Sequence, residues 1–435
     1  MKKLIITECL LMAMLGTFAP TIQAQEYIKN IDNLPGEITL VREYKNDKRV
    51  ICSSRYDSTT FVMVTENGVS APYITILEDI HVSDMEVFGD TLYFCGSIYR
   101  GSLIGYVGFI NLATFPVSSI RLALMYELNY CHRLEVFRSC YDSRIHVIAT
   151  AKETTGKTCL IDCVKDNVLG WEYYKSTGEE TSKVYDDVAA TNQQVIVTVR
   201  DNIDSSGSVY YFNHPTPGNH IFYGYFNELA VYGNVMSEIL VEGKELGEFI
   251  IASKIRQNSV YPYFYLNCFD VVSLNATTLQ FRRTYGSGDV AGTNANSIFD
   301  LKYNRIDKET DMLVNCQYNG FRNSEIYHID TNIVTAKDLY EVQDIQSLDF
   351  LKDDCVNFIG SGYGSRGELW FYKYSPYVLK RCAENQSKTY NPVNWDQKLV
   401  QKKLSFIKLE PFLSLTIQNS GEKIISLICG SEKDE

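Results

Sequence analysis

The sequence predicts an all-β fold, a β-propeller with seven four-stranded blades, and three observations carry this prediction. Short apolar runs rich in aromatic and β-branched residues alternate with turn residues, which is typical of strands rather than helices. The chain has 31 Tyr and 21 Phe but only 10 Pro, and aromatic residues suit half-buried pleated surfaces. The runs also recur in groups, near the repeat of roughly 40 to 50 residues per four strands that propellers show.

One stretch shows the repeat most clearly. Residues 84–112 read DMEVFGDTLYFCGSIYRGSLIGYVGFINL. A Gly-Asp turn separates the first apolar run from a second at 91–97, and the polar loop 98–102 leads into a third run at 103–112. Runs of this length bounded by turn residues predict an antiparallel meander.

Comparable units follow one another along the chain. First strands are expected at 37–44, 84–88, 133–137, 184–191, 237–243, 297–304 and 344–351. Second strands are expected to centre near Ile51, Phe94, Val147, Val197, Ile251, Val314 and Asn357, at spacings of roughly 43 to 63 residues. Third strands are expected at 60–68, 103–112, 157–164, 208–213, 263–274, 325–330 and 368–375, and outer runs at 72–77, 170–174, 220–226, 279–285 and 335–340. Eight blades, or six blades with an appendage, are the alternative arrangements.

The C-terminal segment, residues 382–435, is less regular. Its runs 405–418 and 423–429 flank a turn at Asn419–Glu422, and together they predict one more hairpin. This hairpin has three candidate roles: the outer strands of the last blade, an incomplete eighth blade, or a separate sorting element. We favour the first role because a ring must close its last blade.

The N-terminal residues 1–24 have the features of a secretory signal peptide. Lys2 and Lys3 precede an apolar core at 4–19, and a small-residue exit predicts cleavage after Ala24. An uncleaved anchor is the rival interpretation, but the apolar run is short for spanning a bilayer. No later stretch is apolar enough to span one. Residues 25–435 are therefore expected to form a single propeller domain that is exported, to the periplasm or to the cell surface and beyond.

Charge and cysteine usage limit the function classes. Removing residues 1–24 takes away Lys2, Lys3 and Glu8, which changes the formal charge from −12 to −13. Such an acidic chain is a poor candidate for nucleic-acid binding, which needs a basic face. Several cysteines fall inside expected strands and are predicted to be buried packing residues: Cys52, Cys95, Cys316 and Cys355. Cys159 and Cys163 lie in one strand about 13 Å apart, beyond disulfide reach.

The chain also resembles a known group of proteins. The pattern DMEVFGDTLYFCGS…GSLIGYVGFINL in residues 84–112 resembles the blade repeat of secreted, largely uncharacterised β-propeller proteins of Bacteroidetes. The signal exit at Ala24-Gln25 is similar to theirs as well. The resemblance is sharp over this unit and diffuse over the others. It implies a propeller fold and export, and it implies no activity.

The fold prediction places a candidate binding site. In a propeller the loops after the second and the fourth strands emerge on one face, around the central channel. The loops after the expected second strands share arginine and tyrosine residues, and these form the candidate binding set: Arg55, Tyr56, Tyr99, Arg100, Arg200, Arg256, Tyr318, Arg322, Tyr363 and Arg366. Arginines bind carboxylates or phosphates through two-pronged hydrogen bonds, and tyrosines stack on sugars or fill a partner's pocket. The alternative is that loops are polar in any protein.

Other chemistry has less support in the sequence. The six histidines show no metal-binding spacing, and no metal site, cofactor or catalytic residue is predicted. His81 and Asp84 are a candidate acid/base pair, but we favour a structural role for Asp84. Similarly placed aspartates are expected to bond backbone groups where blades meet: Asp187, Asp300 and Asp349. Three tryptophans are expected in blade cores rather than as sugar platforms: Trp171, Trp370 and Trp395.

Two functional hypotheses follow. The leading one is an exported, non-catalytic binding protein that presents one propeller face to a glycan, a peptide or a surface protein. The alternative is a carbohydrate-active enzyme, a glycoside hydrolase or lyase, with its site at the channel mouth. The missing catalytic motif favours the first, although acid and base groups converge in space rather than in sequence.

Overall fold

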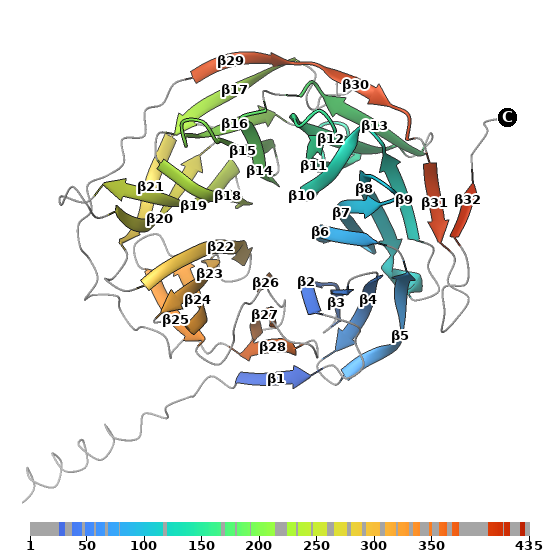
Figure 1. The fold of residues 1–435 in the computed structure, drawn as a ribbon, viewed down its shortest axis with the longest axis horizontal. Coiled ribbons are helices and arrows are strands. Elements are labelled where there is room, and N and C mark those ends of the chain that lie inside the picture. The colour runs from blue at the N-terminus through green and yellow to red at the C-terminus, as the bar shows by residue number, and fades with distance from the viewer. Residues whose placement is uncertain are drawn as a thin grey trace, which may run out of the picture.

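The computed structural model of this chain describes residues 26–430, apart from a set of gaps. The gaps are 31–36, 46–47, 56–57, 66–67, 78, 116–119, 167–169, 179–180, 192, 214–223, 232–233, 245–246, 259–264, 276–279, 289–292, 305–308, 319–320, 330–333, 340–347, 350–355, 363–367, 374–398, 412 and 418–426. The described strands form seven sheets arranged as a ring, and each sheet runs outward from the centre (Figure 1). The predicted all-β propeller class is confirmed.

The sheets are numbered here in chain order. Sheet 1 contains β2 (Glu37–Glu43), β3 (Arg49–Arg55), β4 (Ser58–Thr65) and β5 (Gly68–Leu77). Sheet 2 contains β6 (Ile80–Phe88), β7 (Thr91–Tyr99), β8 (Leu103–Asn111) and β9 (Ile120–Met125), with the short 3-10 helix η1 (Leu112–Thr114) between the last two. Sheet 3 contains β10 (Leu128–Arg138), β11 (Ile145–Glu153), β12 (Thr158–Asp166) and β13 (Gly170–Ser176). Sheet 4 contains β14 (Lys183–Ala190), β15 (Gln194–Asp201), β16 (Gly207–Asn213) and β17 (Gly224–Val231).

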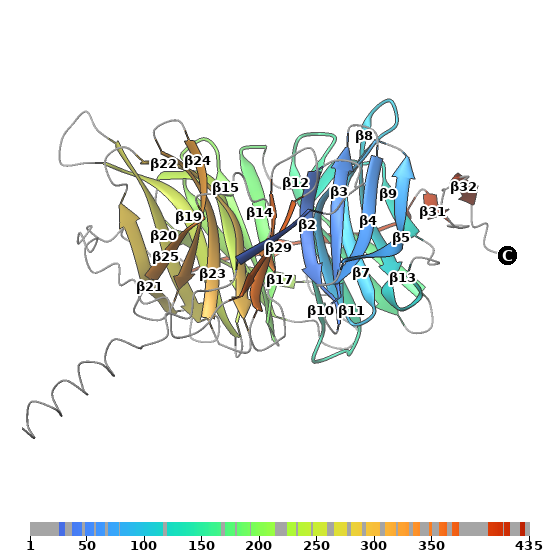
Figure 2. The same ribbon diagram turned by 90° about the horizontal axis from the view of Figure 1, so that it is seen from below.

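The remaining sheets complete the ring. Sheet 5 contains β18 (Asn234–Gly243), β19 (Glu248–Asn258), β20 (Tyr265–Asn275) and β21 (Gln280–Gly288). Sheet 6 contains β22 (Thr293–Asn304), β23 (Glu309–Tyr318), β24 (Phe321–Ile329) and β25 (Val334–Leu339). Sheet 7 contains β26 (Leu348–Asp349), β27 (Val356–Gly362) and β28 (Glu368–Lys373), with β1 (Glu26–Asn30) as its outer strand. The first strands β2, β6, β10, β14, β18, β22 and β26 line the centre of the ring, which Figure 2 shows edge-on.

The expected strand positions agree with the structure in most units. Sheet 2 begins earlier than expected, at Ile80, because the alternating residues before Asp84 already pair with β7. The outer strand of sheet 4 is β17 (Gly224–Val231), whereas the sequence analysis placed it at 220–226. The predicted run 220–226 includes Tyr225 and Phe226 of this strand, but the strand continues through 227–231, which contains no aromatic residue.

The C-terminal segment corrects one prediction. We expected residues 382–435 to close the last blade, but β1 occupies that outer position and pairs with β28. The described C-terminal strands are β29 (Leu399–Leu404), β30 (Phe406–Leu409), β31 (Leu413–Ile417) and β32 (Leu427–Gly430). They add outer strands elsewhere: β29 pairs with β17, β30 with β13 and β31 with β9, and β32 pairs with β31. We call β29 to β31 the belt, because they follow the rim of sheets 4, 3 and 2 (Figure 1).

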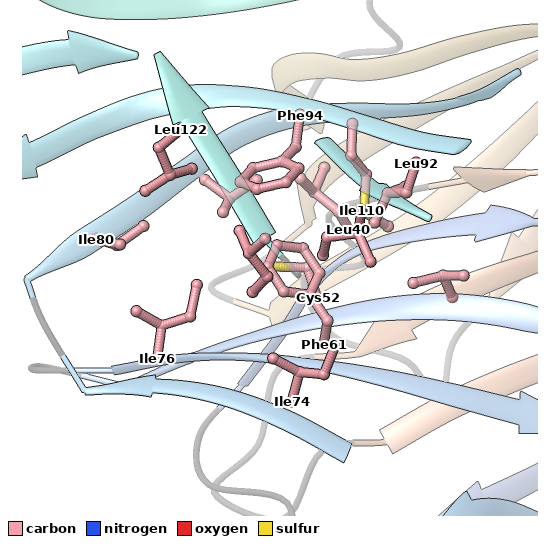
Figure 3. Close-up of a cluster of buried hydrophobic side chains, with 14 of the residues drawn as sticks. Leu40, Cys52, Phe61, Ile74, Ile76, Ile80, Leu92, Phe94, Ile110 and Leu122 are labelled. Carbon is pink, nitrogen blue, oxygen red and sulfur yellow. The ribbon is translucent and has the colours of Figure 1, made fainter. Parts of the chain in front are cut away.

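The core lies between neighbouring sheets rather than in one central mass. Second strands such as β7 and β15 are buried on both faces, which explains their near-continuous apolar sequences. Figure 3 shows the cluster between sheets 1 and 2, where the rings of Phe61 and Phe94 lie 4.9 Å apart. Trp171 packs in the next cluster, against Tyr93 and Phe109, as the sequence analysis predicted.

The cysteines behave as packing residues where they are described. Cys52, Cys95, Cys159 and Cys163 are buried and free, which confirms the packing prediction for Cys52 and Cys95. Burial raises the pKa of the Cys52 thiol to about 12, so it is neutral and unreactive at physiological pH. Cys355 and Trp395 lie outside the described residues, as do the side chains of Cys316 and Trp370.

Gly96 allows a close approach between the first two strands of sheet 2. A Cβ atom at this position would lie 1.9 Å from the carbonyl oxygen of His81 and 3.0 Å from the hydroxyl of Tyr106. That hydroxyl donates to the same carbonyl oxygen at 3.1 Å. The position therefore excludes any side chain.

Gly96→Ala is expected to lower the free energy of unfolding by about 2 kcal/mol, because the backbone of β6 must move to admit the methyl group. Urea unfolding measures this loss. The neighbouring Ser97→Ala serves as the control and is expected to change stability by less than about 0.5 kcal/mol. Equal stability of the two variants would contradict the close approach.

No helix in the described part of the chain is long and apolar enough to cross a membrane.

Candidate functional site

The candidate site lies on the face where the first strands begin. The strands of each sheet are antiparallel, so the start of a first strand lies beside the end of the second strand. Ile80 pairs with Ile98 in sheet 2, and Leu128 pairs with Glu153 in sheet 3. The connections from second to third strands, and from each sheet to the next, emerge on this same face. We call it the mouth face.

The predicted binding residues that the structure describes fall on the mouth face. They lie at the ends of second strands, in the following turn, or at the start of a third strand: Arg55, Tyr99, Arg100, Arg200, Arg256, Tyr318 and Arg322. They belong to sheets 1, 2, 4, 5 and 6, so the backbone distributes them around the ring. Tyr56, Tyr363 and Arg366 lie outside the described residues. The binding role of the set stays a prediction.

Arg200 already has a carboxylate partner. Its Nη2 lies 3.0 Å from Oδ1 of Asp186 and its Nε donates to Oδ2 at 3.2 Å. The backbone N–H of Ile239 also donates to Oδ2, at 3.0 Å. Burial raises the pKa of Asp186 to about 6, against the attraction of Arg200. Since this two-pronged pair uses the guanidinium, Arg200 is a weak candidate for binding an anionic ligand.

A second charged cluster lies at the start of β10. Nε2 of His132 lies 2.9 Å from Oε1 of Glu238, and Arg133 donates to Oε2 of the same carboxylate at 3.2 Å. Burial raises the pKa of Glu238, but the bonds from His132 and Arg133 outweigh it and lower the pKa to about 2. The ring of Tyr130 lies 6.4 Å from that of His132. The cluster therefore joins an acid, a base and a cation from sheets 3 and 5.

Asp84 has a structural role rather than an acid/base one. Its Oδ1 accepts from Arg42 at 3.0 Å and from the backbone of Met85 at 2.8 Å, and its Oδ2 accepts from the backbone of Leu134 at 3.0 Å. These bonds join sheets 1, 2 and 3. His81 is exposed, and its Nδ1 faces the hydroxyl of Ser83 at 3.4 Å. The structure thus supports the junction role over a His81–Asp84 pair.

Asp187 repeats this junction between sheets 4 and 5. Its Oδ1 accepts from the backbone of Val188 and its Oδ2 from that of Val241, each at 2.9 Å. Burial raises the pKa of Asp187 to about 7 in spite of Arg133 nearby. Asp300 accepts from the backbone of Leu301 at 3.0 Å, and the side chain of Asp349 lies outside the described residues. The predicted junction role is confirmed for Asp84 and Asp187.

Farther along the first strands, more charged side chains face the axis. Glu86 Oε2 lies 3.5 Å from Nε of Arg42 and 3.9 Å from Nζ of Lys302. Burial raises the pKa of Glu242 to about 7, against the attraction of Lys302. Burial also raises the pKa of Glu135, and the neighbouring Glu86 and Glu242 raise it further. Of these carboxyls, Glu242 therefore titrates near neutral pH.

Several of these residues were missed by sequence reasoning, notably Tyr130, His132, Arg133 and Glu238. Comparing the first strands with one another would have identified them, because polar residues precede or interrupt the apolar run at the start of each of these strands. The stretches read IHVSDMEVF, LNYCHRLEVF, KVYDDVAA and NVMSEILVEG. Among the described residues, no group of three or more His, Cys, Asp or Glu side chains is placed to hold a metal ion.

The mouth face also exposes apolar side chains. They lie in the turns or strand ends of sheets 2 to 4: Tyr99 (55% exposed), Leu103 (47%), Tyr126 (42%) and Ile203 (83%). Tyr99 and Leu103 pair across the β7–β8 hairpin. Contiguous exposed apolar surface marks interaction sites, and the neighbouring pair Tyr99 and Leu103 is the candidate for such a surface here.

No protein-family model matches the chain, and no curated protein matches its sequence. Among solved structures, the Drosophila semaphorin 2a is 10% identical, with a TM-score of 0.46 over 80% of this chain and 75% of that one. A streptogramin B lyase is 9% identical, with a TM-score of 0.49 over 80% and 98%.

A third similar structure is the β-propeller domain of the trilobed protease from Pyrococcus furiosus. It is 11% identical, with a TM-score of 0.46 over 78% of this chain and 96% of that one. Because the identities and TM-scores of these three structures are low, the assignment of this chain to the β-propeller class rests on the order of its strands in the sheets. The fold defines this chain as a β-propeller protein, and nothing about activity passes from the three structures.

Proposed function

We propose that this protein is an exported, non-catalytic binding protein that presents its mouth face to a partner. The observation that carries the proposal is the exposed apolar set on sheets 2 to 4: Tyr99, Leu103, Tyr126 and Ile203. Of the charged groups on this face, Arg200, His132 and Arg133 bond carboxylates of the same chain, which disfavours an anionic ligand. A peptide or protein surface fits best, and a glycan that stacks on tyrosine is the other candidate. The leader at residues 1–24 supports export.

The test is a glycan-array and thermal-shift screen on residues 25–435, with Tyr99→Asp and Ile203→Asp as variants. A bound ligand at about 100 times its Kd should stabilise the fold by about 2.7 kcal/mol. We expect each variant to weaken binding at least about tenfold, because it places a charge in an apolar contact. The control is Tyr141→Asp, which changes a residue of similar exposure (48%) in the β10–β11 turn on the opposite face.

The outcomes of this screen separate the candidates. A saccharide that binds, persists and is lost only in the mouth variants supports the glycan. No binding on the glycan array, together with binding on a peptide or protein array, supports a protein partner. Equal effects of Tyr141→Asp and Tyr99→Asp would overturn the mouth face as the binding surface.

A second candidate function is a carbohydrate-active enzyme, and the cluster of Tyr130, His132, Arg133 and Glu238 favours it. A histidine oriented by a carboxylate is a common general base, and Tyr130 beside it is a candidate proton donor. Incubation of the protein with array-positive glycans, followed by product analysis, tests this role. Shorter sugars that appear with the unmodified chain and not with His132→Ala would establish the enzyme and overturn the non-catalytic proposal.

A further inference from the structure

An ion pair crosses the axis of the ring. Oε2 of Glu86 in sheet 2 lies 3.9 Å from Nζ of Lys302 in sheet 6. Sheets 7 and 1 lie between these two sheets on the shorter way round the ring, so the strands β6 and β22 face each other across the centre (Figure 1). The side chain of Lys302 is 16% exposed. The two side chains therefore meet inside the ring rather than on its surface.

Other first strands contribute charged groups to this contact. Nε of Arg42 in sheet 1 lies 3.5 Å from the same oxygen of Glu86, and the Arg42 side chain is buried. Lys302 also attracts two more carboxyls, Glu135 of sheet 3 and Glu242 of sheet 5. We call these five residues the axial cluster: Arg42, Glu86, Glu135, Glu242 and Lys302.

Glu135 and Glu242 occupy equivalent positions on their strands. Each directly follows a residue whose backbone N–H donates to a junction aspartate, Leu134 in sheet 3 and Val241 in sheet 5. Oε1 of Glu242 accepts from the backbone N–H of Tyr303 at 3.2 Å. Among the described residues, Glu135 has no hydrogen-bond or ion-pair partner, and the other two carboxyls of the axial cluster repel its negative charge. Glu135 is therefore the carboxyl of the cluster that is least compensated.

Carboxyls outnumber cations among the described charged groups near the axis. The axial cluster has three carboxyls and two cations, and the groups that precede it on the first strands add three carboxyls and one cation: Asp84, Asp187, Asp300 and Arg133. A buried carboxyl without a counter-charge is more stable with a proton bound. Burial raises the pKa of Asp187 and of Glu242 to about 7, and it raises the pKa of Glu135 as well. The folded ring therefore keeps protons on some of these carboxyls at pH values where the unfolded chain has lost them.

We propose that the axial cluster is a proton-sensitive lock of the ring: protons on its surplus carboxyls keep sheets 2, 3, 5 and 6 together at the axis, and release of these protons as the pH rises loosens the first strands. In the protonated state Glu86 pairs with both cations, and the neighbouring carboxyls are neutral. In the deprotonated state three carboxylates compete for two cations and repel one another across the axis. This inference does not depend on the function of the mouth face.

The direction of the pH dependence follows from proton linkage. A glutamate of the unfolded chain ionises near pH 4.5, whereas Glu242 of the folded ring keeps its proton up to about pH 7. The folded state binds more protons between these two values, so the stability of the unmodified chain falls as the pH rises from about 4.5 to about 7. Glu135→Gln puts a neutral group at the least compensated position and is expected to remove part of this loss.

The test is urea unfolding of the unmodified chain, Glu135→Gln and Lys302→Gln at pH 5 and pH 8. Relative to the unmodified chain, Glu135→Gln is expected to raise the folding equilibrium constant at least about tenfold more at pH 8 than at pH 5. Lys302→Gln leaves the carboxyls with one cation fewer, so it is expected to have the opposite effect and to steepen the loss. The control is Glu248→Gln, an exposed position on β19, with less than about a twofold change.

The proposal is overturned if Glu135→Gln changes the pH dependence no more than Glu248→Gln does, or if Lys302→Gln makes it flatter. Hydrogen exchange, corrected for its intrinsic pH dependence, locates the loosening. Amides of β6 and β22 in the unmodified chain are expected to exchange at least about tenfold faster at pH 8 than at pH 5, and Glu135→Gln should remove most of this increase. Strand β8, farther from the axis in sheet 2, is the internal reference. An equal increase in β6, β22 and β8 would show a loss of stability in the whole ring and would also overturn the lock.

Discussion

Asp84→Ala is expected to lower the free energy of unfolding by about 4 kcal/mol, because it leaves a buried cation short of its counter-charge. The side chains of Asp84 and Arg42 are 7% and 4% exposed, and their N–O distance is 3.0 Å. The backbone N–H of Leu134 loses its acceptor at the same time, which adds the cost of a buried unsatisfied donor. The loss is read from urea unfolding followed by fluorescence and by circular dichroism.

A matched control lies between the same two sheets. Lys45 and Asp90 form an ion pair whose side chains are 52% and 50% exposed. Asp90→Ala is expected to cost far less than Asp84→Ala, because solvent screens this pair. Asp84→Asn keeps an acceptor oxygen and should fall between the two. If Asp84→Ala lowers the free energy of unfolding no more than Asp90→Ala does, Asp84 does not stabilise the junction, and the acid/base role with His81 becomes the better interpretation.

His146→Gln is expected to destabilise the protein by about 3 to 5 kcal/mol at pH 6, because the buried Asp162 loses its cation, whereas Asp142 keeps its ion pair with Arg144. Nδ1 of His146 lies 3.1 Å from Oδ1 of Asp162, and Nε2 lies 3.4 Å from Oδ2 of Asp142. The ring also stacks on Phe137, with an interplanar angle of 11°. The H146Q/D162N double variant should recover more than about 1 kcal/mol, since it removes the unpaired charge of Asp162.

This prediction has a defined pH dependence. Burial lowers the pKa of His146, but Asp162 and Asp142 outweigh it and raise the pKa from 6.5 to about 9. A raised folded pKa means that the stabilisation is complete below pH 6.5 and is lost as the pH rises through 9. The unmodified chain should lose on the order of 3 kcal/mol over this window through His146.

Comparing the unmodified chain with His146→Gln at each pH isolates this contribution. The carboxyls of Asp187 and Glu242, with pKa values raised to about 7, weaken the fold as the pH rises toward 7 in both proteins. The stability difference between the two proteins should shrink from pH 6 to pH 9. A constant difference would contradict a charged His146 between the two carboxylates.

Much of the fold was predictable because its signals are local. Turn residues and apolar runs located the strands of sheet 2, and the run 91–97 became the doubly buried strand β7. The aspartates at 84 and 187 were identified as junction residues from their repeated position, and the structure shows the backbone groups that they bond. A repeating architecture presents the same local pattern many times, so sequence reasoning identifies it well.

The candidate site was less predictable for a physical reason. No local pattern in the sequence links Arg200 to its partner Asp186. The two residues lie on neighbouring strands, and the bulge between Tyr185 and Asp187 sets the spacing between their side chains. His132 and Glu238 are 106 positions apart and meet because their strands lie in different sheets of one ring. Which side chains pair between different sheets depends on how the sheets are arranged in the ring, and local sequence patterns do not predict such pairs.

The closure of the ring shows most clearly which features the sequence predicts and which ones only the tertiary structure decides. Composition, strand order and the need for a strand that closes the ring follow from local segments, and together they predict a propeller. Which segment supplies that strand depends on long-range pairing, and the structure assigns it to β1 while the C-terminal strands extend sheets 4, 3 and 2. Strand pairing is decided by backbone hydrogen bonds and by apolar anchors such as Phe406, whose partners are distant in the chain. Only the folded ring brings those partners together.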